Sequence, residues 1–79
     1  MKNINDIKKQ IIKALSHEEA EEGLYLQNFY EHSEEDERPL VKAKEEDIIE
    51  ALNILIKEGK VRVDEFSDKI TFNLERASL

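Results

Sequence analysis

The two histidines of this chain each lie near carboxylates at a spacing that could serve chemistry. His17 and Glu21 are four residues apart, as two metal ligands on one side of a helix would be. Three carboxylates follow His32: Glu34, Glu35 and Asp36. Both groups stand in polar, acid-rich stretches of the kind that usually face water, and the second lacks the alternating carboxylates and the glycine of a calcium loop. We therefore predict no metal site.

The rest of the chain is poor in groups that perform catalysis. It has no cysteine and only two glycines, and it contains neither a nucleophile elbow nor a phosphate-binding loop. Without cysteine, disulfides and thiolate-bound metals are excluded as well. The sequence predicts a protein that is not an enzyme, with no catalytic residue, no cofactor and no small-molecule substrate.

The length and composition suit one domain. Seventy-nine residues, 39% of them apolar, can build one modest core, so we expect a single domain over residues 1–79. Residues 33–39 are predicted to form an exposed acidic loop and residues 75–79 a frayed tail. The N-terminus mixes isoleucines with charges and resembles neither a signal peptide nor a membrane span, so a cytoplasmic location is expected and no membrane partner.

The net charge of −7 is unevenly spread along the chain. Residues 1–16 carry a balance of plus three, residues 17–50 minus ten, and residues 51–79 zero. An acidic middle disfavours nucleic acid and favours a basic partner, although the need for solubility would explain the same charge.

Apolar residues at helical spacing predict two amphipathic helices. The first covers residues 4–15, with Asn3 as its N-cap. The second covers residues 44–58 and ends at Gly59. Its predicted core face consists of Ile48, Ile49, Ala51, Leu52, Leu55 and Ile56. Its predicted outer face consists of Glu46, Asp47, Glu50, Asn53, Ile54 and Lys57.

Alternating residues after Gly59 predict a β-hairpin with a turn at residues 65–68. The inward residues of its strands would be Val61, Val63, Ile70, Phe72 and Leu74. Together with the two helices they predict one core, which contains Ile7, Ile11, Leu15, Ile48, Leu52, Leu55, Val61, Ile70 and Phe72. Residues 24–32 fit a strand and a helix equally well; a short strand at 24–26 that enters a short helix at 27–32 would satisfy both patterns.

This order of elements, with a helix that runs through Leu52, Leu55 and Gly59 into a strand at Val61, resembles the winged-helix family over residues 4–74. The resemblance implies an α+β fold, a small winged-helix-like domain of two to three helices followed by a C-terminal hairpin, the wing. In DNA-binding members the third helix lies in the major groove and the wing contacts phosphate. The corresponding reading face would be the outer face of helix 44–58, and the wing contacts would be Lys60, Arg62 and Lys69.

Three of the six side chains on that reading face are carboxylates, which DNA phosphates repel. We therefore expect a regulatory module that binds another protein, or a second copy of itself, and a basic partner would suit the acidic surface. Its expected contact residues are Glu46, Asp47, Glu50, Asn53, Ile54, Lys57 and Phe66. The alternatives are a small DNA-binding transcriptional regulator that uses the wing and the first helix, and an inhibitor that imitates DNA with its carboxylates.

Overall fold

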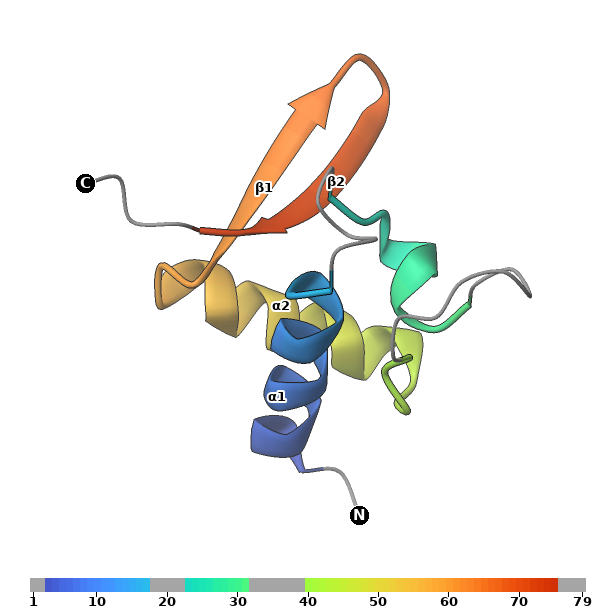
Figure 1. Cartoon of the computed structure of the whole chain (residues 1–79), viewed down its shortest axis with the longest axis vertical. Coiled ribbons are helices and arrows are strands. Elements are labelled where there is room, and N and C mark those ends of the chain that lie inside the picture. The colour runs from blue at the N-terminus through green and yellow to red at the C-terminus, as the bar shows by residue number, and fades with distance from the viewer. Residues whose placement is uncertain (1–2, 18–22, 32–39, 76–79) are drawn as a thin grey trace.

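The computed structural model describes residues 3–17, 23–31 and 40–75. Within them the chain is α+β, with two α-helices followed by a C-terminal antiparallel hairpin in a winged-helix-like arrangement (Figure 1). The elements are α1 (Ile4–Leu15), the 3₁₀ helix η2 (Leu26–Phe29), α2 (Glu45–Lys57), β1 (Val61–Phe66) and β2 (Lys69–Leu74). The acidic loop predicted at 33–39 and the tail after Glu75 lie outside the described residues.

Helix α1 begins and ends where the sequence predicts. The side chain of Asn3 accepts hydrogen bonds from the backbone N–H groups of Asn5 and Asp6, at 3.1 and 3.3 Å, and so satisfies donors that a helix start leaves open. The apolar stripe of the helix is buried at Ile7, Ile11, Ala14 and Leu15. Because α1 packs against α2 through this stripe, Lys9 and Lys13 are left exposed, while Lys8 is half-buried.

Helix α2 ends in a Schellman motif centred on Gly59. The N–H of Lys60 donates to the carbonyl of Leu55 at 2.9 Å, and the N–H of Gly59 donates to that of Ile56 at 3.0 Å. Gly59 has φ of +74°, which a residue with a Cβ adopts only under strain. This cap turns the chain directly from α2 into β1, so it sets the position of the hairpin on the helices.

Gly59→Ala is expected to lower the free energy of unfolding by about 1 kcal/mol, because alanine disfavours the left-handed backbone. Space is not the cause, since a Cβ at this position would meet nothing within 4 Å. Chemical denaturation of both proteins measures the loss. Gly59→Asn should lose less, because asparagine tolerates this conformation better; equal losses for the two variants would contradict the explanation.

The segment before η2 pairs with the hairpin, and the predicted short strand at 24–26 is reduced to one residue. Leu24 and Phe72 exchange both backbone hydrogen bonds, at 3.0 and 2.8 Å, so a single residue acts as the strand. The helical part is the four-residue η2 rather than a helix over 27–32. It buries Phe29 completely, and this ring meets Phe72 edge to face with centroids 5.9 Å apart. Leu24, Phe29 and Val41 are thus core residues that the periodicity analysis did not identify.

The hairpin projects beyond the helices (Figure 1). Its strands pair from Val61 with Leu74 to Phe66 with Lys69, so the turn contains only Ser67 and Asp68 and is shorter than predicted. Val61 at the base is buried, whereas Ile70 near the tip is 49% exposed. The prediction that Ile70 belongs to the core is therefore wrong, because no helix reaches the outer half of the wing to cover it.

Most of the predicted core is confirmed. Ile7, Ile11 and Leu15 of α1 form one cluster with the α2 and β1 residues Ile48, Leu52, Leu55 and Val61, and Phe72 is half-buried against it. The placement of Ile49 on the core face is wrong, since its side chain is 40% exposed. At about 100° per residue Ile49 lies at the edge of the apolar arc, and α1 and the hairpin cover only the centre of that arc.

Candidate functional site

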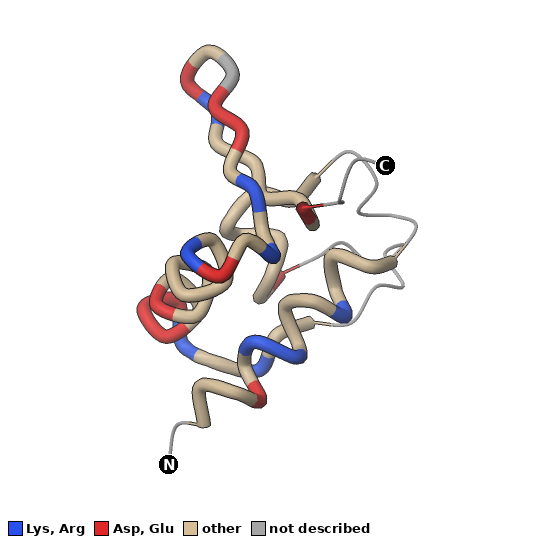
Figure 2. The backbone as a smooth tube through the Cα atoms, turned by 90° about the vertical axis from the view of Figure 1, so that its left-hand side faces the viewer, with Lys and Arg blue, Asp and Glu red and all other residues tan. Residues whose placement is uncertain are grey.

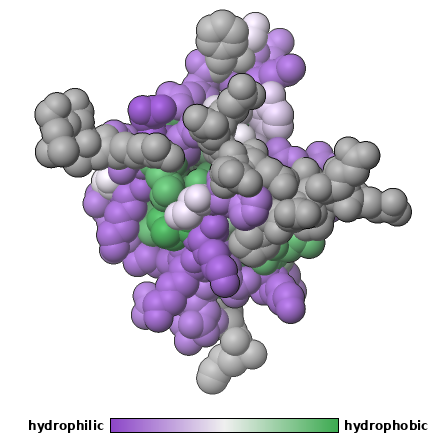
Figure 3. Space-filling view, in the orientation of Figure 1, coloured by the Kyte–Doolittle hydropathy of each residue, from purple (hydrophilic) through white to green (hydrophobic). Residues whose placement is uncertain are grey.

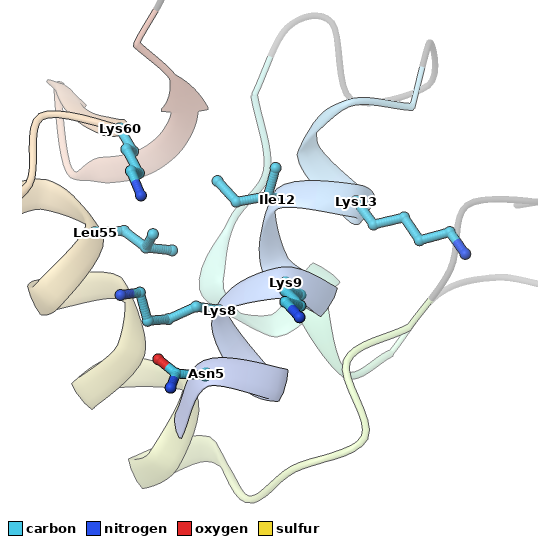
Figure 4. A pocket seen from close by; sticks show the side chains of 7 residues that line it. All are labelled: Asn5, Lys8, Lys9, Ile12, Lys13, Leu55 and Lys60. Atoms are coloured by element: carbon cyan, nitrogen blue, oxygen red, sulfur yellow. The ribbon is translucent and has the colours of Figure 1, made fainter. Parts of the chain in front are cut away.

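A groove lies between α1, the end of α2 and the start of β1. Its volume is about 490 Å³, and its lining residues are Asn5, Lys8, Lys9, Ile12, Lys13, Leu55 and Lys60 (Figure 4). Ile12 and Leu55 supply its apolar lining near Lys8 and Lys60, whereas the side chain of Lys13 extends away from them (Figure 4). Figure 3 shows apolar side chains bordered by hydrophilic ones on the face that it views. The groove thus combines apolar and cationic contacts in one hollow, as ligand sites often do.

The local order of the chain explains why these lysines meet. Lys8 and Ile12 lie beside the buried stripe of α1 and are half-buried, whereas Lys9 and Lys13 lie on the exposed side of the helix. Lys60 follows the Gly59 cap, which turns the chain from the end of α2 toward β1. In Figure 2 the backbone positions of the α1 lysines and of the α2 carboxylates lie on different sides of the molecule.

Glu58 offsets part of the positive charge of the groove. Its Oε1 lies 2.8 Å from the Lys8 Nζ and 4.0 Å from the Lys60 Nζ. The hydrogen bond from Lys8, followed by the charges of Lys8 and Lys60, lowers the pKa of Glu58 against the opposing effect of desolvation. The folded-state pKa is therefore below the unfolded one, so the ion pair contributes at neutral pH and is lost as the pH falls through the lowered pKa.

The outer face of α2 has much of the exposure predicted for it. Glu46, Glu50, Asn53 and Lys57 are exposed, while Asp47 and Ile54 are half-buried. The exposed Ile49 lies next to this set, with Glu46 and Asn53 one turn away on either side. Sequence analysis missed Ile49 because it placed that residue in the core. Phe66 belongs to β1, but the structure describes only its backbone and not its side chain.

The predicted wing contacts do not come together. Lys60 lines the groove with the lysines of α1, but Arg62 pairs with Asp64 on its own strand at 3.1 Å, and Lys69 lies at the turn of the hairpin. The carboxylate of Asp64 also accepts a hydrogen bond from Asn73 at 3.2 Å. Arg62 is therefore held in a neutral cluster on the wing rather than in a stripe with the basic groove.

The histidine groups are only partly covered by the structure. His17 is half-buried just after α1, whereas Glu21, His32, Glu34, Glu35 and Asp36 lie outside the described residues. Among the residues that are described, no cluster of three or more histidine or carboxylate side chains is arranged to hold a metal ion. Nor does any helix in this part of the chain have the length and apolar character needed to cross a membrane.

Comparison of this chain with protein-family models, with curated proteins and with solved structures found no match. Membership of the winged-helix family therefore stays a prediction. The order of elements in the structure is the one on which that prediction is based.

Proposed function

We propose that this chain is a non-catalytic protein-binding module, and that its lysine groove takes an acidic segment of the partner that also carries an apolar side chain. The observation that carries the proposal is the groove itself, which is lined by Lys8, Lys9, Lys13 and Lys60 together with the apolar Ile12 and Leu55. Carboxylates of the partner would meet the lysines, and its apolar side chain would contact Ile12 and Leu55.

The groove supports this function better than the acidic face of α2 supports binding of a basic partner. In the groove a ligand would contact two helices and the turn that leads into β1, so the packing of the fold would hold these contacts in place. The outer face of α2 offers side chains from one helix, with Ile49 as its most exposed apolar residue. Binding of a basic partner to that face is a prediction that rests only on the charge pattern of the sequence.

A second candidate, a small DNA-binding regulator, is favoured by the same lysines of α1 and by Lys60. Three features weaken the attraction to phosphate. Glu58 pairs with Lys8, Asp64 pairs with Arg62, and the exposed side of α2 is acidic. We expect no binding to mixed-sequence duplex DNA tighter than roughly 10⁻⁴ M at physiological salt.

Fluorescence anisotropy with a labelled peptide of sequence EELEELFEE tests the proposal. Removing two groove lysines together, Lys9→Ala with Lys13→Ala, is expected to weaken binding by about tenfold, because both residues line the groove and are exposed to a ligand. Glu58→Gln should instead tighten binding, since it removes the carboxylate that offsets Lys8 and Lys60.

The matched control is Lys44→Ala with Lys57→Ala, which removes the same charge from exposed lysines that do not line the groove. This control should bind the peptide almost as the wild type does. An equal loss of affinity in both double variants would mean that only net charge matters, and it would contradict the proposal that the peptide binds in the groove. Micromolar binding of a DNA duplex, lost in the groove variant, would support the second candidate instead.

A further inference from the structure

Strand β1 has one edge that no described residue pairs with. The backbone N–H and C=O of Phe72 both bond to Leu24, on the side of β2 that faces away from β1. Phe72 and Val63, which lie opposite each other, therefore form a non-hydrogen-bonded pair of the antiparallel ladder. The N–H and C=O of Val63 therefore point away from β2. By alternation the same holds for Val61 and Glu65. Within the described part of the chain, these groups make no backbone hydrogen bond to another segment.

This edge also carries exposed apolar surface. Val63 is 40% exposed and Ile70, its diagonal neighbour on β2, is 49% exposed. Both lie on the face of the hairpin that reaches the core at Val61, so the apolar face of the wing continues outward beyond the helices. An open strand edge beside exposed apolar side chains is a template for another strand.

The charges of β1 favour pairing with β1 of a second copy, and they favour one register of that pairing. Only outward-facing residues can bond across the new junction, so Val61, Val63 and Glu65 must pair among themselves. Suppose that a two-fold axis through Val63 relates the two copies, so that their β1 strands run antiparallel. Arg62 then lies opposite Asp64 of the second copy, and Asp64 lies opposite its Arg62. A shift of the axis to residue 62 would oppose two arginines, and a shift to residue 64 would oppose two aspartates.

We propose that two copies of this chain associate through their β1 edges, antiparallel about Val63, to form a continuous four-stranded sheet across a two-fold axis. Val63 bonds to Val63 of the second copy, and Val61 bonds to its Glu65 in both directions. The arrangement closes as a dimer because each copy uses its β1 edge, while β2 is already bridged by Leu24. This interface does not depend on what the groove binds.

Charge exchange tests the dimer, with sedimentation velocity of the full chain over a range of concentrations as the measurement. Arg62→Asp alone places carboxylates opposite Asp64 of the second copy, and Asp64→Arg alone places arginines opposite its Arg62. Each variant alone is expected to dimerise about tenfold more weakly than the wild type or worse. An equimolar mixture of the two variants should regain the dimer, because both junctions then join opposite charges.

The mixture also controls for folding, since a hairpin damaged by either substitution would not be rescued by the other variant. Amide hydrogen exchange supplies a second readout that follows backbone bonds. The Val63 amide should exchange more slowly as the protein concentration rises, whereas the Arg62 amide, which already bonds to β2, should change little. A chain that stays monomeric at millimolar concentration, or a dimer indifferent to both charge reversals, would overturn the proposal.

Discussion

Phe29→Ala is expected to lower the free energy of unfolding by about 3–5 kcal/mol, the range found for deletion of a buried aromatic ring. The ring is completely buried and packs edge to face on Phe72, so its loss leaves a cavity between η2 and the hairpin. A domain of 79 residues has a total stability of roughly 4–12 kcal/mol, so the substitution would remove about a quarter of it or more. Urea denaturation followed by circular dichroism measures the change.

Tyr25→Ala is the matched control for this ring. It removes an aromatic side chain from the residue that precedes η2, but that side chain is 44% exposed. We expect the control to lose much less stability than Phe29→Ala. A result in which both variants unfold at the same urea concentration would show that η2 is not anchored through Phe29.

Leu52→Ala is expected to cost roughly 2–5 kcal/mol, because a buried leucine at the centre of a small core leaves a cavity that its neighbours fill only in part. Leu52 is 1% exposed on the side of α2 that packs against α1 and the hairpin. Thermal unfolding followed by calorimetry would detect the loss as a large fall in Tm.

Ile49→Ala serves as the control on the same helix, with a similar loss of apolar volume at a side chain that is 40% exposed. We expect a change within about 0.5 kcal/mol, typical of a surface substitution. A thermal midpoint unchanged by Leu52→Ala, or one lowered more by Ile49→Ala, would mean that the buried face of α2 has been misassigned.

The groove could not be predicted from patterns in the sequence. The lysines of α1 appear in the sequence as a local positive balance, and Lys60 appears just before the first strand, but no pattern in the sequence indicates that they come together. They line one groove because α1 crosses α2 and because the Gly59 cap turns the chain into β1. The partner of Lys8, Glu58, likewise comes from a distant helix end.

The local elements of this protein follow from short-range patterns in its sequence. Helical and alternating periods, the Asn3 cap and the Gly59 stop depend on residues within a few positions of one another, so α1, α2 and the hairpin could be predicted from them. Which apolar residues are covered depends instead on how distant segments pack together. Ile49 and Ile70 have the right spacing for a core, yet burial depends on how far the neighbouring elements reach. The same applies to Phe29 and to the lysine groove, because packing between distant segments places them and no local pattern records it.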